Sequence, residues 1–437
     1  MKTYNICIVG TGYVGLVTGA CMAEIGHHVV CVDADRKKIK TLKAGLCPIH
    51  EPGLLPLVKK NVKARRLAFT HSIAEGMRHR GRRAEVVFIA VGTPPRPDGS
   101  ADLSSVEAVA AETARAMRDY TVIVDKSTVP VETGAWVDKT VRRVNKRGVP
   151  FDVTSNPEFL SEGSAVTDFM HPDRIVLGVS SPRAEKVLRG VYAPLKAPIL
   201  VTDVKSAELI KHASNSFLAT KISFINAVSR VCEAVGADVN LVAQGMGLDK
   251  RIGASFLRAG LGFGGFCFPK DLEAFLEIAK GKGYDFELLR TVSEINKTQK
   301  DWVQRHVEAE LWNLEEKRIA VLGLAFKPHT DDLRFAPSLD IIKRLQSHRV
   351  RVCAHDPVAM PKARALLKGV SFAEDPYATA KGADCLVIVT EWPEYKDLDL
   401  RRIYRLMRNP VILDGRNLYD PATIRKLGFA YHSVGRP

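Results

Sequence analysis

The chain opens with YNICIVGTGYVGLVTGACMAEIGHHVVCVDAD at residues 4–35, and this stretch predicts the fold. An apolar run is followed by a glycine turn, a helix-like segment and a second apolar run, all within about thirty residues. Gly10 permits a tight turn, Gly12 lets the backbone approach a pyrophosphate, and Gly15 lets the helix pack closely on the strand. The helix N-terminus would then present its unpaired N–H groups to phosphates. Together these features predict a doubly wound, dinucleotide-binding fold.

Asp33 ends the second predicted strand of this unit. A carboxylate at that point can accept hydrogen bonds from both hydroxyls of a ribose and repels a 2′-phosphate, so the sequence predicts NAD rather than NADP. Two further predicted strands, at 85–94 and 121–129, end in VGTP and KSTV. Because ligands lie at the carboxyl ends of strands in such sheets, Thr93 and Thr128 are candidate cofactor contacts. Their spacing fits an ordinary capping role almost as well.

Length and composition are those of a globular protein rather than a disordered or membrane-spanning one. Of the 437 residues, 46% are hydrophobic and 26% are charged. No stretch approaches the ~18 uninterrupted apolar residues of a membrane span, and the N-terminus lacks the layout of a signal peptide. The length predicts two or three domains of about 100–200 residues each. We therefore expect a cytoplasmic protein that does not associate with membranes.

The chain is basic, with 64 lysines and arginines against 49 aspartates and glutamates, a formal net charge of +15. Two basic runs, VKKNVKARR at 58–66 and MRHRGRR at 77–83, are typical of solvated helix surfaces. A positive field that attracts small phosphorylated ligands is the second interpretation. No aromatic-interleaved basic face accompanies the runs, so we expect no binding of nucleic acid.

The eight cysteines are scattered, without a CxxC pair or a His/Cys cluster at zinc spacing, so we expect no metal site. Most lie in apolar runs, where a thiol packs as a small hydrophobic group. Cys267 differs, because it follows GLGFGG at 260–265, whose backbone can approach a ligand closely, and precedes Pro269, Lys270 and Asp271, which we expect to open a helix. A thiol there should ionise readily and act as a nucleophile. A buried cysteine between two phenylalanines is the alternative.

Residues 203–235 contain no glycine or proline and predict one long helix. Its apolar residues, with Leu209, Phe217 and Ile225 among them, fit one broad face, as in a helix that bridges domains or packs on a second subunit. From residue 317 the strand pattern of the first domain recurs without its glycine fingerprint. The prediction is an α/β protein with two doubly wound Rossmann-like domains joined by a long-helix central domain, with bounds 1–202, 203–300 and 317–437.

Specific strings follow one another along nearly the whole chain. They are GTGYVG (10–15), EPGL (51–54), VGTP (91–94), KSTVP (126–130), NPEFLSEGSAVTDFMHPDRIVLG (156–178), ELIKHASNSFLATKISFIN (208–226), RIG (251–253), GFGGFCFPKD (262–271), GLAFKPHTDDLR (323–334) and DGRN (414–417). In these strings the chain resembles the nucleotide-sugar 6-dehydrogenases, the UDP-glucose/GDP-mannose dehydrogenase family. So many separate matches in order make coincidence negligible.

The resemblance implies an NAD-binding domain, a central helical domain through which two subunits form a homodimer, and a C-terminal domain that binds the uridine nucleotide. It implies NAD-dependent, four-electron oxidation of the C6 alcohol of UDP-glucose to UDP-glucuronate through a thiohemiacetal and a thioester of Cys267. The alternatives are a UDP-N-acetylhexosamine or GDP-mannose 6-dehydrogenase, and a nucleotide-sugar-binding homologue that has lost catalysis. The string at 156–178 favours UDP-glucose, and the intact set of Lys211, Asn215, Cys267 and Asp271 argues against lost catalysis.

The same resemblance assigns catalytic roles. Lys211, on the long helix, would stabilise negative charge on the reacting oxygen, with Asn215 one turn further on. Asp271 resembles the aspartate that pairs with this lysine and holds a water. Glu158 matches the glutamate proposed as general base for thioester hydrolysis, with Thr128 orienting the water. The catalytic set is Cys267, Lys211, Asn215, Asp271, Glu158 and Thr128.

The remaining matched positions would bind ligands. Those on the cofactor side are Gly10, Gly12, Tyr13, Val14, Gly15, Asp33, Lys38, Thr93, Thr128, Glu162, Lys270 and Arg334. Those on the substrate side are Glu158, Phe159, Leu160, Lys211, Asn215, Arg251, Phe256, Arg258, Gly262, Phe263, Gly264, Lys327 and Arg416. One departure adjoins the nucleophile, because Phe266 stands where the family usually has serine. This difference bears on sugar preference and rate more than on the type of reaction.

Overall fold

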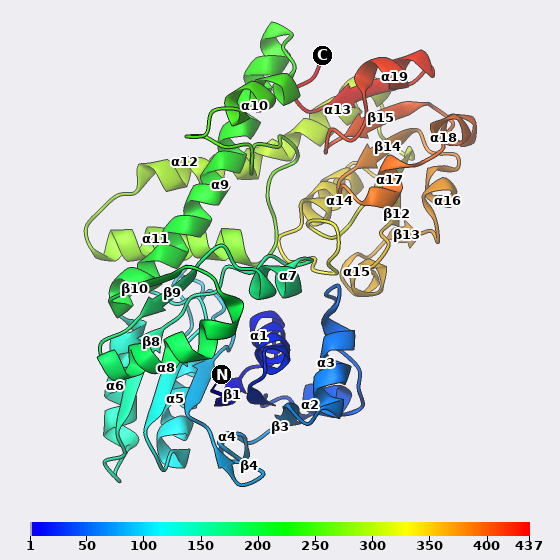
Figure 1. Ribbon diagram of the computed structural model, residues 1–437. Coiled ribbons are helices and arrows are strands. Elements are labelled where there is room, and N and C mark those ends of the chain that lie inside the picture. Colours follow the sequence, from blue (N-terminus) through cyan, green and yellow to red (C-terminus); the bar gives the residue numbers. More distant parts are fainter. Residues whose placement is uncertain (1) are drawn as a thin grey trace. The chain divides into compact units, whose positions relative to one another are not determined.

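The computed structural model describes residues 2–437 (Figure 1). The chain forms two compact units, Met1–Ser214 with Glu273–Gly283, and Asn215–Leu272 with Tyr284–Pro437. The division passes through two helices, α9 (Val204–Val235) and α11 (Cys267–Gly281), so each of these helices contributes to both units.

The first unit is built on an eight-stranded sheet in the order β10-β9-β8-β7-β6-β1-β2-β3. Its neighbouring strands run parallel, except that β8 and β9 are antiparallel. The strand order reverses between β1 and β6, and in doubly wound sheets a ligand binds at the carboxyl ends of the strands at such a point. The strands are β1 (Asn5–Val9), β2 (His28–Val32), β3 (Leu67–Thr70), β6 (Val86–Ile89), β7 (Thr121–Asp125), β8 (Phe151–Ser155), β9 (Ile175–Gly178) and β10 (Ile199–Thr202).

Helices cover both faces of this sheet, which explains why its strands are almost continuously apolar. Along β1, Ile6 and Ile8 face one helical layer, and Cys7 and Val9 face the other. The first layer contains α1 (Tyr13–Glu24), α2 (Arg36–Lys43), α3 (Leu54–Lys63), α7 (Ala165–Met170) and α8 (Pro182–Tyr192), which continues into the 3-10 turn η1 (Ala193–Leu195). The second contains α4 (Ile73–Gly76), α5 (Ser104–Ala116) and α6 (Thr133–Val144), and the hairpin of β4 (Arg78–His79) and β5 (Arg82–Arg83) follows α4.

The second unit repeats this architecture with a six-stranded, wholly parallel sheet in the order β13-β12-β11-β14-β15-β16. The prediction of a second doubly wound domain is confirmed. The strands are β11 (Arg318–Leu322), β12 (Arg351–His355), β13 (Val370–Phe372), β14 (Cys385–Ile388), β15 (Val411–Asp414) and β16 (Ala430–Ser433). One face packs on α13 (Asp301–Leu311), α14 (Pro337–Ser347) and α15 (Met360–Leu366), the other on α16 (Pro376–Ala380), α17 (Pro393–Lys396), α18 (Leu400–Leu406) and α19 (Pro421–Lys426).

The C-terminal sheet has its own aspartate after the second strand, but its carboxylate is filled by protein donors. Asp356 Oδ2 accepts the N–H groups of Leu324 and Ala325 at 2.7 and 3.0 Å and the indole N–H of Trp392 at 3.1 Å. The loop after β11 is therefore hydrogen-bonded directly to Asp356, in the place where the first domain has an open glycine loop. The Asp356 carboxylate therefore stabilises the fold by linking separate segments of the chain.

Helix α9 has the predicted length but two apolar sides instead of one. Ile225 is fully buried, whereas Leu209 and Phe217 are 40% and 64% exposed, so the prediction of a single apolar face is wrong. At 3.6 residues per turn, Leu209 and Ile225 lie about 160° apart around the helix, a separation too wide for one packed stripe. Two further helices of the second unit are α10 (Val239–Gly247) and α12 (Glu287–Gln299). None of the helices within residues 2–437 combines the length and apolar character that crossing a membrane requires.

Candidate functional site

The glycine loop between β1 and α1 leaves space for a ligand at one position. A Cβ on Gly10, whose φ is +107°, would lie 2.3 Å from the carbonyl oxygen of Ala90, and one on Gly15 would lie 2.0 Å from that of Gly10. A Cβ on Gly12 would meet no atom of residues 2–437 within 4 Å. Gly12 is the N-cap of α1 and supplies no capping side chain, so the N–H groups of the first turn are directed at this space. The loop therefore fits a dinucleotide pyrophosphate.

The Asp33 carboxylate lies beside this loop. Its Oδ2 accepts the N–H and the hydroxyl of Thr11 at 2.9 and 2.7 Å, and its Oδ1 accepts the N–H of Asp35 at 2.9 Å. Burial alone would raise the pKa of Asp33, but the hydrogen bonds from Thr11 and Asp35, with the charge of Lys38 3.7 Å away, outweigh it and lower the pKa. The carboxylate is therefore ionised at neutral pH, and Oδ1 can accept a further hydrogen bond from a ribose hydroxyl.

Replacing Asp33 by asparagine is expected to reduce the preference for NAD over NADP, measured as the ratio of the two kcat/KM values, by about 10–100-fold, the scale of one hydrogen bond to a charged group. Asparagine keeps an oxygen for the Thr11 donors but removes the charge that repels a 2′-phosphate. The control is Asp35→Asn. The Asp35 side chain caps α2 and, within residues 2–437, forms no hydrogen bond to the glycine loop. An unaltered ratio in Asp33→Asn would contradict the ribose assignment.

Two threonines connect the carboxyl ends of the neighbouring strands β6 and β7. The Thr93 hydroxyl donates to the carbonyl oxygen of Thr128 at 2.9 Å. Thr93 is buried and Thr128 is half-buried. Both lie at the sheet edge where the glycine loop lies, and the hydrogen bond between them fits a capping role, so their assignment as cofactor contacts stays a prediction.

A buried ion pair joins the segment after β8 to α9. Lys211 Nζ lies 2.9 Å from Glu158 Oε1, and neither side chain is more than 5% exposed. The neighbouring Lys126 donates to Asn156 Oδ1 at 3.0 Å. Burial and then the charge of Lys211 lower the pKa of Lys126 to about 8, against the attraction of Glu158. Lys211 is thus the amine that pairs with Glu158, and its ammonium suits a reacting oxygen with developing negative charge.

The segment after Glu158 is held against helix α1. The N–H of Gly163 donates to both the Tyr13 hydroxyl, at 2.9 Å, and Glu51 Oε2, at 2.7 Å. The Phe159 ring lies 3.7 Å from the Arg174 guanidinium, within cation–π distance. The structure thus brings Tyr13 of the cofactor set close to the segment that contains the substrate set. The other predicted residues of these two segments, Val14, Leu160 and Glu162, are half-buried.

Cys267 is the first residue of α11 and is exposed, so the alternative of a buried, packing cysteine is wrong. Six of the other cysteines are buried and Cys47 is half-buried. We expected the helix to open at Pro269, but it begins two residues earlier, because proline is tolerated within a first helical turn. The sulfur therefore sits at the positive end of a 15-residue helix.

One turn further along α11, Asp271 is fully buried and binds two other residues of the predicted site. Its Oδ2 accepts the side-chain N–H of Asn215 at 2.6 Å, and its Oδ1 lies 2.7 Å from Lys270 Nζ. The first contact ties α9 to α11, and the second neutralises the buried carboxylate. The ammonium of Lys270, which the resemblance puts on the cofactor side, is thus engaged by Asp271.

Phe266, the residue that departs from the family pattern, lies between two cations. Its ring centroid is 4.4 Å from the Arg334 guanidinium and 5.7 Å from Lys270 Nζ. Arg334 is also held by a two-pronged ion pair with Asp332, with Nη2–Oδ2 at 2.6 Å. The aromatic ring therefore helps to fix the guanidinium of a predicted cofactor contact, which a serine at this position could not do.

The amide side chains of three residues hold the loop at 260–265 by hydrogen bonds. The amide of Asn296 pairs with the backbone of Phe263 in both directions, at 2.7 and 3.0 Å. Asn226 Oδ1 accepts the N–H of Gly260 at 2.9 Å, and Gln299 donates to the Gly260 carbonyl oxygen at 3.0 Å. None of these three amides was a candidate in the sequence analysis, because polar residues on helices give no local signal of the loop that they hold.

The remaining predicted substrate contacts differ in their relation to this loop. Arg416 Nη1 lies 3.5 Å from the carbonyl oxygen of Gly262, while its Nε donates to the Val389 carbonyl oxygen at 2.6 Å. Arg251 is exposed and forms a two-pronged ion pair with Asp249. Within residues 2–437 no hydrogen bond joins Arg251 or Arg258 to the loop. The other members of this set are Phe256, exposed with φ +65°, Gly264, buried against Phe335, and Lys327, half-buried with Nζ 5.5 Å from the Phe326 ring.

Three sequence profiles of one protein family match consecutive parts of the chain. They describe the NAD binding domain (residues 4–196), the central domain (205–298) and the UDP binding domain (320–421) of the UDP-glucose/GDP-mannose dehydrogenase family. UDP-glucose 6-dehydrogenase TuaD of Bacillus subtilis is 48% identical over 99% of this chain and 93% of its own length.

Solved structures of two nucleotide-sugar dehydrogenases also superpose on nearly the whole chain. A UDP-glucose dehydrogenase from Pyrobaculum islandicum superposes with a TM-score of 0.92 at 40% identity, covering 100% of this chain and 98% of that one. A UDP-D-ManNAc dehydrogenase from Pyrococcus horikoshii reaches a TM-score of 0.87 at 27% identity, covering 99% of each chain.

Proposed function

This chain belongs to the UDP-glucose/GDP-mannose dehydrogenase family, and we propose that it is an NAD-dependent UDP-glucose 6-dehydrogenase that forms UDP-glucuronate. The observation that carries the proposal is the exposed Cys267 in the first turn of α11, one turn before the buried Asp271 that binds Asn215. The open space at Gly12 and the ionised Asp33 support NAD as the cofactor.

When bound at the loop after β1, NAD accepts the hydride that leaves C6 in each of the two oxidations. As the C6 hydroxyl loses its proton to water, the Lys211 ammonium would stabilise the negative charge on its oxygen. The Cys267 sulfur then adds to the aldehyde carbon, and the oxygen takes up a proton to give a thiohemiacetal. This covalent bond keeps the intermediate on the protein, and the saturated carbon retains a hydrogen for the second hydride transfer.

Loss of that hydride leaves a thioester on Cys267. Glu158, within the buried ion pair, would take a proton from the attacking water, which Thr128 orients. The C–S bond breaks as the carboxylate forms, and the sulfur leaves as thiolate. In sum, one alcohol, one water and two NAD give one carboxylate, two NADH and three protons.

Oxidation of UDP-glucose is expected to yield two NADH for each sugar consumed, because the sulfur retains the aldehyde for the second step. The measurement is NADH absorbance at the end point with limiting nucleotide sugar, together with chromatography of the product. One NADH per sugar with free aldehyde accumulating would overturn the thioester route. Tight binding of UDP-glucose without any NADH would identify a homologue that has lost catalysis.

The same assay with UDP-N-acetylhexosamines and GDP-mannose tests the choice of sugar. The greater identity to UDP-glucose dehydrogenases than to the UDP-D-ManNAc enzyme supports UDP-glucose. Faster NADH production with an N-acetylated sugar or with GDP-mannose would reassign the substrate within the family.

Exposed apolar side chains on α9 support a homodimer formed through the central helix. Phe217, Phe224 and Val231 recur every seven residues, all more than half exposed. Such a row of large apolar side chains along one helix is typical of an interface, and a stable interface buries about 1,200–2,000 Å² in total. The two apolar sides of α9 then have separate uses, one in the core of the subunit and one against the partner.

The double variant Phe217→Asp/Phe224→Asp is expected to be monomeric at micromolar concentration, as measured by light scattering after gel filtration. Two charges facing their symmetry copies in an apolar interface cannot be solvated. The control is Leu366→Asp, which alters an exposed leucine on α15 and should leave the dimer intact. A dimer that survives in the double variant would place the interface elsewhere.

Three further assignments belong to this proposal. The domain bounds 1–202, 203–300 and 317–437 follow the changes in sequence pattern. The ligand-contact sets of the sequence analysis are proposed with their stated roles. A cytoplasmic location suits a reaction that needs Cys267 reduced.

A further inference from the structure

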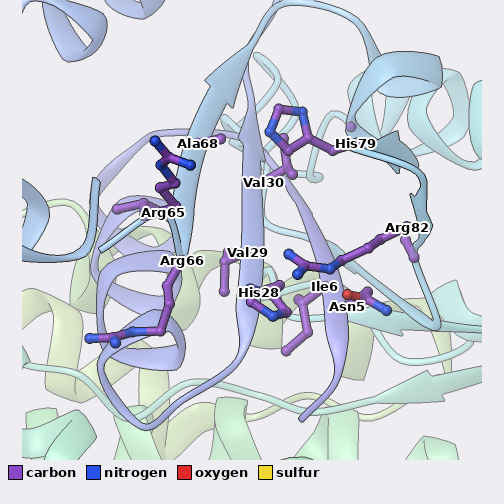
Figure 2. Close-up of a pocket in the computed structure, with 13 residues that line it drawn as sticks. Asn5, Ile6, His28, Val29, Val30, Arg65, Arg66, Ala68, His79 and Arg82 are labelled. Atoms are coloured by element: carbon purple, nitrogen blue, oxygen red, sulfur yellow. The ribbon is translucent and has the colours of Figure 1, made fainter. Parts of the chain in front are cut away.

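A hollow at the amino ends of strands β1, β2 and β3 is lined by positively charged and imidazole side chains (Figure 2). Figure 2 shows Arg65 and Arg66 on one side of the hollow and Arg82 reaching in from the other toward His28, with His79 above. The hollow lies at the opposite ends of the strands from the glycine loop. Because β1 has five residues, these ends are about 13–17 Å apart.

The acidic groups around this hollow are engaged elsewhere. Glu85 pairs with Lys2 at 2.7 Å and Asp119 with Arg83 at 2.6 Å, while Glu24 pairs with Lys60. Glu75, whose charge acts on His79, accepts a hydrogen bond from the hydroxyl of Thr70. Within residues 2–437, Arg65 and Arg82 therefore have no acidic partner. Like charges held together without a counter-ion are unfavourable, so a bound anion would relieve the repulsion.

The two histidines have nitrogen atoms that lack partners. His28 Nδ1 and His79 Nε2 are shielded from solvent and form no hydrogen bond within residues 2–437. Burial, and then the charges of nearby arginines, lowers the pKa of His28 and of His79, so both rings are neutral at pH 7. An anion in the hollow would give these rings an acceptor and would also offset the charge of Arg82, which acts on both.

The β4–β5 hairpin continues the positive surface on its other side. Arg78 pairs with Arg83 and His79 with Arg82, so the alternation of side chains puts the first pair on one face and the second on the other. The charged residues that line a second hollow on the first face are Arg78, Arg83, Arg118 and Asp119, and Asp119 pairs with Arg83. The second hollow thus carries less net positive charge than its arginines alone would give, and the first hollow is the stronger candidate for an anion.

Backbone conformation shows that two arginines occupy positions that suit other residues better. Arg80, with φ +51°, and Gly81, with φ +76°, form the two-residue turn of the hairpin, where Asn-Gly is preferred. Arg65 has φ +56°, again in the left-handed region. An arginine at either position costs backbone energy and adds charge to a surface that is already repulsive, which indicates a role for the charge itself.

We propose that the mouth of the first hollow, lined by Arg65, Arg82, His28 and His79, binds a phosphate group of a small ligand. Guanidinium groups bind phosphate oxygens in two-pronged geometry, and the neutral imidazoles can each donate one N–H. No Phe, Tyr or Trp lines either hollow, so there is no platform on which nucleic-acid bases could stack. The site is separate from the glycine loop and can be filled together with NAD.

The test is isothermal titration of the full chain with inorganic tripolyphosphate in the presence of saturating NAD and UDP, which fill the other phosphate sites. The wild-type protein is expected to bind with 1:1 stoichiometry. Arg65→Ala/Arg82→Ala should bind at least about tenfold more weakly, because two charge-assisted contacts are lost. The control is Arg401→Ala/Arg405→Ala, which removes the same charge from exposed positions on α18 and should bind as the wild type does.

A thermal melt without ligand establishes that each variant is folded. If Arg65→Ala/Arg82→Ala is unstable, Arg65→Lys/Arg82→Lys keeps the charge, loses the two-pronged geometry, and should still bind several-fold more weakly. Equal affinity in the variants and the wild type would overturn the proposal, as would loss of binding when NAD and UDP are added. Tighter binding of a thymidine oligonucleotide than of tripolyphosphate would overturn the assignment to a small ligand.

Discussion

Replacing Cys267 by alanine should abolish formation of the acid while leaving the binding of UDP-glucose and NAD in place. Without the sulfur no covalent bond retains the aldehyde, and the second oxidation lacks its thiohemiacetal. The expected loss in kcat for acid formation is at least about 10³-fold, the scale found when a covalent nucleophile is removed. NADH production and product chromatography measure the loss, and titration calorimetry measures binding of each ligand.

The control is Cys47→Ala. Cys47 is half-buried, and burial raises the pKa of its thiol, so it is a packing cysteine on the first sheet. Its variant should keep full activity. Unchanged turnover in Cys267→Ala would remove the sulfur from the mechanism, and loss of nucleotide binding would mean that Cys267 holds the fold of α11 instead.

Replacing Lys211 by methionine should reduce both activity and stability. The Glu158 carboxylate would remain buried without its counter-ion, and breaking a buried pair in this way costs about 3–5 kcal/mol. For a unit of this size the loss corresponds to a fall in Tm on the order of 6–20 °C. Loss of the ammonium next to the reacting oxygen should lower kcat by about 10²–10³-fold.

A second substitution separates the two effects. In Lys211→Met/Glu158→Gln the buried carboxylate is neutralised, so most of the lost Tm should return, whereas acid formation should stay absent because both proposed groups are gone. Recovery of activity together with stability would show that Lys211 is structural. A Tm unaffected by Lys211→Met would mean that the pair is more hydrated than its burial indicates.

The two doubly wound sheets, the long helix and the glycine loop could all be predicted from the sequence. These features depend on local spacing: alternating apolar runs, glycines at fixed offsets, and a long segment without helix breakers. Gly10 and Gly15 illustrate this, because a Cβ on either would collide with a backbone carbonyl oxygen, of Ala90 after the adjacent strand or of Gly10 in the same loop. The candidate residues Cys267 and Asp33 were found in the same way.

Which side chains contact one another could not be predicted from local sequence patterns, because it depends on the tertiary structure. Asn215 and Asp271 are 56 positions apart, and Glu158 and Lys211 come from a loop and a distant helix, so their contacts follow from packing. The same is true of α9, for which the sequence predicted one apolar face and the structure shows two apolar sides. It is also true of the arginine hollow, whose basic residues the sequence predicted to lie on solvated helix surfaces. Periodicity reports how a segment folds, whereas exposure and contact depend on what other segments cover, and that is set by the long-range free energy of burial.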